Sequence, residues 1–144
     1  MGARTKARKR ALDLLYGAEL RGQPLDAALT PADGATGADD AGQDGRPLND
    51  YTVTLVRGVS EHQTRIDDLL GDFAVGWPLA RMPAVDRNLL RIGVFEVLMV
   101  DDVPPEVAIS EAVHLAHELS TDESPRFVNG LLARVAERRP TLTG

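Results

Sequence analysis

The sequence predicts an all-α fold, and three observations support that prediction. Apolar residues recur every three, four or seven positions in each structured stretch, which is the spacing of one face of a helix. No segment of any length shows the alternation of apolar and polar residues that is typical of a half-buried strand. Prolines stand where helices are expected to begin, at Pro104–Pro105 and at Pro125. We expect five main helices and two short helical turns.

The first expected helix covers residues 5–20. Its apolar stripe consists of Ala7, Ala11, Leu14, Leu15 and Ala18. Residues 22–47 lack such a stripe, apart from one or two weak turns around Leu25 and Leu29.

The segment at about 31–47 is acidic and rich in glycine, without a large apolar side chain, so burial cannot offset the entropy of ordering it. We expect a mobile acidic loop there, within a single domain of residues 1–144. The alternative is an acidic segment that competes with nucleic acid for the basic end of the chain.

Helical spacing resumes at residue 48 and continues to residue 73, which predicts one long helix capped by Asn49 or Asp50. A short turn is expected at residues 79–82. Residues 84–100 are apolar on most sides, which predicts a helix at the centre of a bundle. A strand over residues 92–100 is the alternative, but 17 residues without a turn signal favour a helix. The last two helices are expected to start after Pro104 and at Ser124, with Ser124 as the N-cap.

Composition excludes several classes of protein. The chain has no cysteine, which rules out disulfides, zinc-finger ligation and thiol catalysis. No apolar run approaches the ~20 residues that cross a bilayer. The basic start is not followed by the features of a signal peptide, so we expect a cytoplasmic protein without a membrane segment. The overall net charge of −6 argues against a nucleic-acid-binding protein, but a basic patch that is separated from the acidic residues can still bind phosphate.

The sequence gives no positive sign of catalysis, and we expect no enzyme, cofactor or metal site. Glu111 and His114 have the Glu-x-x-His spacing of di-iron bundles, but no second copy accompanies them. Both lie off the apolar stripe, which favours a solvated helix face. His62 is explained by packing or partial exposure. Glu96 sits inside an apolar run, and a partner such as Arg91, or a subunit contact, accounts for it.

The basic start of the chain is the strongest functional signal from spacing alone. Five of the 16 lysines and arginines lie in the first ten residues, without any acid among them: Arg4, Lys6, Arg8, Lys9 and Arg10. At about 100° per residue, Tyr16 points away from the apolar stripe and lies in line with Lys9. Cations beside an exposed ring are typical of phosphate attraction combined with base stacking. The alternative is a flexible basic tail.

The last expected helix offers a second binding element. Its N-terminus presents free N–H groups and the positive end of the helix dipole, and Arg126 adds charge. Phe127 lies beside the core stripe, where its ring can either reach solvent or pack the start of the helix. Asp122 and Glu123 oppose an anion, so this end should receive a base more readily than a cluster of phosphates.

Four segments resemble the NusB family of bacterial transcription antitermination factors. They are KARKRALDLLY, MPAVDRNLLRIGVFEVL, VPPEVAISEAVHLAHELST and DESPRFVNGLLARV. Their order and spacing cover nearly the whole chain except residues 22–47. RFVNGLL following VAISEAV is specific, whereas the acidic glycine-rich segment is not typical of the family.

The resemblance implies an all-α fold of two packed helical sub-bundles. It implies binding to boxA RNA and a heterodimer with NusE, a ribosomal small-subunit protein, within a complex of other Nus factors and RNA polymerase that promotes processive transcription of ribosomal RNA. The basic N-terminus, Tyr16 and Phe127 match the RNA surface of the family. Asp86 matches an acid on the side toward NusE, and we group Glu96 with it. Some members of the family are homodimers, so that state stays open.

Two alternatives remain. One is a stand-alone RNA-binding module related to the N-terminal domains of ribosomal RNA cytosine methyltransferases, which we expect less because no methyltransferase domain follows up to Gly144. The other is a helical adaptor that binds only proteins, in which the basic end meets an acidic protein.

Overall fold

The computed structural model describes residues 2–29, 48–74 and 76–140, and over these ranges it contains six α-helices, two 3₁₀ turns and no strand. The predicted all-α fold is therefore confirmed. The loop expected at about 31–47 lies outside the described residues. The chain divides into two compact units, Met1–Glu61 and His62–Gly144. The expectation that they act as a single domain stays a prediction.

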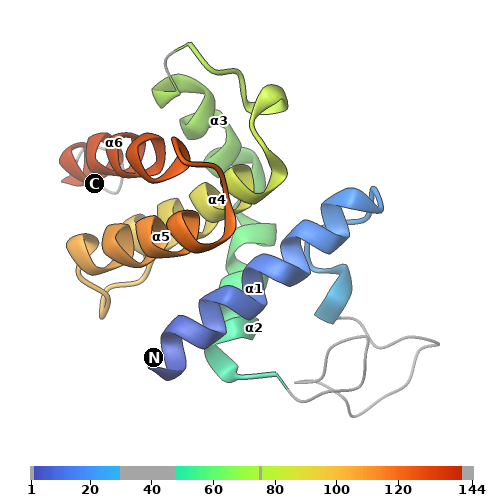
Figure 1. The fold of residues 1–144 in the computed structure, drawn as a ribbon. Helices are drawn as coiled ribbons and strands as arrows, with labels where there is room; N and C mark the ends of the chain where they lie inside the picture. The colour runs from blue at the N-terminus through green and yellow to red at the C-terminus, as the bar shows by residue number, and fades with distance from the viewer. Residues whose placement is uncertain (1, 30–47, 75, 141–144) are drawn as a thin grey trace. The chain divides into compact units, whose positions relative to one another are not determined.

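The first unit is built on two helices that pack against each other, α1 (Ala3–Leu20) and α2 (Asp50–Glu61), with the 3₁₀ turn η1 (Ala27–Leu29) beside them (Figure 1). The Thr52 hydroxyl of α2 donates a hydrogen bond of 3.1 Å to the Ala7 carbonyl of α1. Asn49 caps α2 as predicted, because its Oδ1 accepts the Tyr51 N–H at 2.7 Å. Polar side chains thus define where α2 starts and how it meets α1.

A glycine ends α1. Gly22 adopts a φ of +66°, the left-handed conformation that a side chain disfavours. The N–H groups of Gly22 and Gln23 then bond back to the carbonyls of Glu19 and Ala18, which satisfies the last turn of the helix.

The buried face of α1 differs from the predicted stripe. Leu12 is buried and Leu14 is only half-buried, and Arg8 is also buried. The whole buried face is therefore rotated around the helix toward Leu12. Four alanines and four leucines, spread around the axis, leave the inward direction of this helix weakly defined, so spacing alone placed the centre of its buried face on the wrong side of Ala11.

The second unit gathers three helices around α4 (Ala84–Met99), which contacts α3 (Gln63–Phe73), α5 (Pro105–Leu119) and α6 (Ser124–Glu137). In Figure 1, α5 and α6 run side by side. The 3₁₀ turn η3 (Leu79–Arg81) precedes α4, where a short turn was predicted. Every α4 residue from Asn88 to Leu98 is buried, which confirms the central place of this helix. The strand alternative for residues 92–100 is wrong.

One glycine lets two helices of this unit approach closely. A Cβ at Gly93 of α4 would lie 2.6 Å from Cδ1 of Leu132 on α6, and Leu132 is itself fully buried. The glycine therefore provides the space that the leucine fills.

The predicted long helix over residues 48–73 is wrong in one respect, because it is broken at His62 into α2 and α3. His62 leaves helical geometry with φ −107° and ψ 17°. The break falls at the border between the two units. Apolar residues keep their helical spacing on both sides of it, so periodicity does not reveal it.

The start of α6 also departs from expectation. Pro125 lies in the first turn as predicted, but Glu123 and not Ser124 occupies the N-cap position. The Ser124 side chain is fully buried and donates to Asp86 instead. A carboxylate inside the unit therefore takes the hydroxyl that was expected to cap the helix. By contrast, Pro105 begins α5 as predicted.

Candidate nucleic-acid interface

The five cations near the N-terminus do not form one uniform surface. Arg4 and Lys6 are exposed, whereas Lys9 and Arg10 are half-buried. Arg8 is only 3% exposed. A helix distributes consecutive residues around its axis, so a basic run in the sequence becomes cations on several faces. Four of the five side chains retain surface that a phosphate can reach.

The ring of Tyr51 on α2 lies close to two of the arginines, Arg4 and Arg8. The Arg4 guanidinium carbon lies 4.4 Å from the centroid of the Tyr51 ring, and that of Arg8 lies 5.7 Å from it. Both distances allow a cation–π attraction, which is stronger where the cation is desolvated. Arg4 and the buried Arg8 therefore share the Tyr51 ring as a packing partner. Its spacing had marked it only as part of the apolar stripe of α2.

A small cleft of about 290 Å³ lies between α1 and the start of α2. Lys6 and Arg10 line it from α1, where their spacing of four residues places them on one face. Leu48, Asn49 and Thr52 line the opposite side. The cleft therefore presents two of the predicted phosphate-binding cations together.

Tyr16 is half-buried and does not stand fully on the solvent face. The rotation of the buried face of α1 toward Leu12 brings Tyr16 to its edge. Part of this residue remains accessible to solvent, as a stacking role requires.

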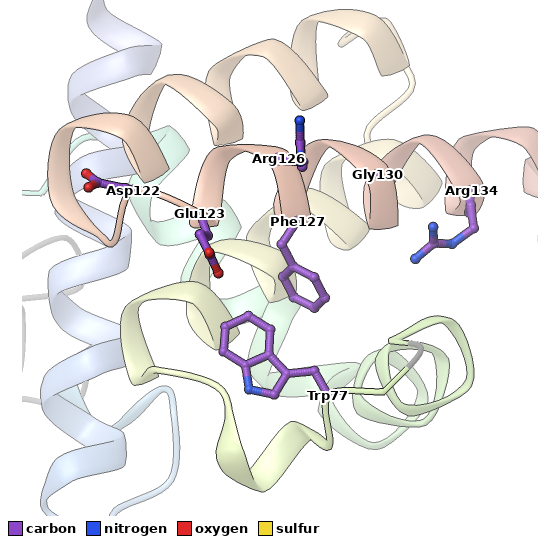
Figure 2. Close-up of a pocket in the computed structure, with 7 residues that line it drawn as sticks. All are labelled: Trp77, Asp122, Glu123, Arg126, Phe127, Gly130 and Arg134. Carbon is purple, nitrogen blue, oxygen red and sulfur yellow. The ribbon is translucent and has the colours of Figure 1, made fainter.

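The second unit contains an open groove of about 790 Å³ with an aromatic pair in it (Figure 2). Trp77 and Phe127 meet edge to face, with their ring centroids 4.6 Å apart and their planes at 68°. Both rings are half-buried, so each keeps a surface toward solvent. Of the two alternatives considered for Phe127, a ring that reaches solvent and a ring that only packs the start of the helix, the structure favours the first. Trp77 was not predicted as a site residue, although it is the only tryptophan of the chain.

Charges of both signs surround the aromatic pair. Arg126 and Arg134 line the groove along α6, and Asp122 and Glu123 line it near the start of that helix. Arg134 is fixed by a 2.9 Å hydrogen bond from Nη2 to the Phe73 carbonyl. Two acids balance two arginines, so the groove suits a flat aromatic ligand such as a base better than a cluster of phosphates.

The two acids expected to face a protein partner are both buried. Asp86 is 0% exposed and Glu96 is 1% exposed. The Asp86 carboxylate accepts hydrogen bonds from the Ser120 hydroxyl at Oδ1 and from the Ser124 hydroxyl at Oδ2, the latter at 2.8 Å. A partner could touch either carboxylate only after the side chains packed over it had moved. Their assignment to a partner stays a prediction.

The Glu-x-x-His pair on α5 does not gather further ligands. His114 is exposed and lies 3.6 Å from Glu118, one turn further along the same helix. Over the described ranges, no group of three or more His, Asp or Glu side chains is arranged to hold a metal ion. None of the helices in the described part of the chain combines the length and the apolarity of a bilayer span.

Comparison with known proteins places this architecture. The model of the NusB family matches residues 5–137. A transcription antitermination protein NusB of a Nocardioides species is 56% identical over 142 residues, with 99% of each chain covered. That of Kineococcus radiotolerans is 57% identical over 144 residues, again with 99% of each chain covered.

Solved structures show the same fold. NusB of T. maritima superposes with a TM-score of 0.78 at 29% identity, covering 94% of this chain and 92% of the other. A NusB in a crystal structure with NusE and double-stranded RNA superposes with a TM-score of 0.71 at 23% identity, covering 93% and 96%. The family match and the identity to the antitermination proteins define the class of the protein as a transcription antitermination factor and not an enzyme. The chain belongs to the NusB family.

Proposed function

We propose that this protein binds boxA RNA together with NusE and thereby promotes processive transcription of ribosomal RNA. The observation that carries the proposal is the half-exposed Trp77–Phe127 pair in a groove flanked by arginines, in a chain whose first helix is basic. A protein of the same fold has been solved with NusE and RNA, which supports this proposal. Other Nus factors and RNA polymerase complete the proposed complex in the cytoplasm.

The predicted RNA-binding residues divide into two roles. Arg4, Lys6, Lys9 and Arg10 attract phosphates, because each keeps exposed surface on α1. Arg8 acts indirectly, by packing with Arg4 on the ring of Tyr51. These side chains supply affinity that depends on salt.

The rings supply recognition that is largely independent of salt. Tyr16 and Phe127 stack on bases, and Trp77 joins them through its contact with Phe127. Arg126 lines the same groove with its side chain directed away from the two rings (Figure 2), so it supplies charge at the rim of the groove.

The proposed NusE contact lies on the side of α4 that carries Asp86 and Glu96. Because both carboxylates are buried, we propose that they shape this surface from beneath and that NusE touches the residues around them. A homodimer that uses the same face would compete with NusE.

The test is binding to a boxA RNA and to a scrambled RNA of equal length, with and without NusE, at two salt concentrations. Preference for boxA that increases with NusE is the expected result. Equal binding to both RNAs would contradict the proposal and favour a nonspecific basic tether. Capture of NusE without any salt-dependent RNA binding would favour the protein-only adaptor.

Single substitutions locate the recognition surface. Phe127→Ala and Tyr16→Ala should each weaken boxA binding by about 1–3 kcal/mol at both salt concentrations, the usual worth of a stacked base. The change in salt dependence should be small, since no phosphate contact is lost. Circular dichroism must first show native helicity. Folded variants lacking both rings that bind boxA like the parent would refute aromatic recognition.

A further inference from the structure

The two walls of the aromatic groove come from different parts of the chain. Trp77 lies just before the turn η3, and Phe127 lies in the first turn of α6. Fifty positions separate them in the sequence, yet their rings are 4.6 Å apart. Something must therefore hold the turn and the helix at this spacing.

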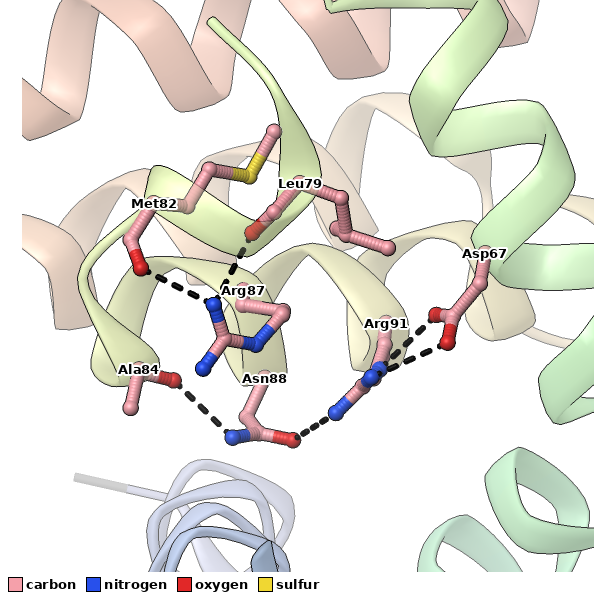
Figure 3. Close-up of polar contacts among 7 residues, drawn as sticks. All are labelled: Asp67, Leu79, Met82, Ala84, Arg87, Asn88 and Arg91. Atoms are coloured by element: carbon pink, nitrogen blue, oxygen red, sulfur yellow. Dashed lines mark hydrogen bonds and ion pairs between the residues drawn. The ribbon is translucent and has the colours of Figure 1, made fainter.

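Arg87, near the start of α4, holds the wall that carries Trp77. Its Nη1 donates to the carbonyls of Leu79 and Met82, each at 2.9 Å (Figure 3). These carbonyls lie at the two ends of the short segment that follows Trp77 and Pro78. A single guanidinium nitrogen thus ties both ends of this segment to α4, through hydrogen bonds strengthened by its charge.

Asp86, the preceding residue, holds the wall that carries Phe127. Its two oxygens accept the hydroxyls of Ser120, at the end of α5, and of Ser124, the first residue of α6. Thr121 joins the cluster through a 2.7 Å contact between its Oγ1 and the Ser124 Oγ. Asp86 and Ser124 have no exposed surface, so water cannot replace these bonds. Ser124 lies three residues before Phe127, on the same turn of α6.

We propose that Asp86 and Arg87 are positioning residues that set the spacing of the Trp77–Phe127 groove, each by fixing one of its walls to the start of α4. Since they are adjacent on one rigid helix, neither wall can shift without breaking a charge-assisted bond to α4. The effect on RNA rests on the proposed function, but the ring geometry is a property of the free protein. The two parts can therefore be tested separately.

The free protein offers a direct signal, because Trp77 is its only tryptophan. Ser124→Ala removes one of the two hydroxyls that hold Asp86, and Arg87→Gln removes the guanidinium that bridges the two carbonyls. In each variant we expect a red shift of tryptophan emission and a higher acrylamide quenching constant, since the rings separate. Arg87→Lys keeps a cation that can reach a carbonyl and should restore part of the parent signal.

Asp67→Asn is the matched control. Asp67 binds Arg91 of α4 through two contacts of 2.9 and 3.0 Å, which join α3 to α4 and involve neither Asp86 nor Arg87 (Figure 3). The control should lower the urea midpoint as the test variants do, but it should leave tryptophan emission and quenching unchanged. An equal spectral change in Asp67→Asn would show that the effect is general loosening and would overturn the proposal.

RNA binding provides the second readout. Ser124→Ala and Arg87→Gln should weaken boxA binding by about fivefold or more, the lower end of what one stacked base contributes, with no change in salt slope. If both folded variants keep the parent quenching constant, the positioning role is refuted whatever the RNA result. If quenching rises while boxA affinity stays at the parent value, the positioning role holds and the groove is excluded as an RNA site.

Discussion

Arg8 shows how a single residue can carry charge without offering it to a ligand. It belongs to the basic run of the sequence, yet it is buried against the ring of Tyr51. Asp86 is a similar case, since its carboxylate is occupied by two serine hydroxyls. For both residues the charge stabilises the arrangement of neighbouring side chains. Counting charged residues in the sequence therefore overestimates the charge available to partners.

The burial of Arg8 leads to a prediction for the salt dependence of RNA binding. If the four remaining cations of α1 each meet a phosphate of single-stranded RNA, this helix contributes a slope of log affinity against log salt no steeper than about −2.8, at ~−0.7 per contact. Replacing Lys6 and Arg10 with Gln should make the slope shallower by about 1.4. Arg8→Gln should change stability more than slope.

Fluorescence anisotropy over a salt series measures these slopes, and urea unfolding measures the stabilities. An Arg8→Gln variant with native stability, but with a slope shallower by the ~0.7 of one phosphate contact, would show that Arg8 reaches phosphate.

At the scale of elements, close packing between α4 and α6 defines the core of the second unit. Gly93 lies where the two helices approach, and the fully buried Leu132 fills the space beside it. Gly71, on α3, is a matched glycine with no atom within 4 Å of the position of a Cβ. Both glycines lie within helices, Gly93 in the middle of α4 and Gly71 in the last turn of α3, and only Gly93 has a side chain packed against it.

Gly93→Ala should therefore destabilise the protein although alanine is the better helix former. Overpacking of a core typically costs ~1–3 kcal/mol, and the gain in helix propensity offsets up to ~1 kcal/mol. We expect a net loss of about 1–2 kcal/mol in the free energy of unfolding. Gly71→Ala should instead raise stability by about 0.5–1 kcal/mol. Urea unfolding of both variants is the measurement, and stabilisation by Gly93→Ala would contradict the packing argument.

At the scale of the whole molecule, the basic helix α1 and the acids Asp86 and Glu96 belong to different compact units. Each unit has its own packed helices: the first holds the cations expected to meet phosphate, and the second holds the aromatic groove and the two acids. The proposed contacts with RNA phosphates and with NusE should then be separable by substitution.

We predict that a double variant in which both Lys6 and Arg10 are replaced by Gln captures NusE as the parent does but binds RNA more weakly. Substitution is preferable to removing residues 1–10, because Ala7 and Arg8 are buried and their loss would disturb the fold. Pull-down with immobilised NusE, in the absence of RNA, measures the first effect. Loss of NusE capture in the folded double variant would show that the cations of α1 contribute to the protein interface.

The sequence by itself determined the helical class, the central place of α4 and the start of α5 at Pro105. It also identified the family, through motifs that lie in short continuous segments. These features depend on spacing along the chain and on local backbone preferences, which are legible without a structure.

Only the tertiary structure decided which of the predicted site residues reach the surface and which partners they have. The contact of Phe127 with Trp77, the capture of Ser124 by Asp86 and the packing of Arg8 on Tyr51 join residues 38 to 50 positions apart. The break at His62 likewise leaves the apolar spacing intact. Such contacts depend on how helices pack, because packing selects among side-chain positions that periodicity leaves equivalent.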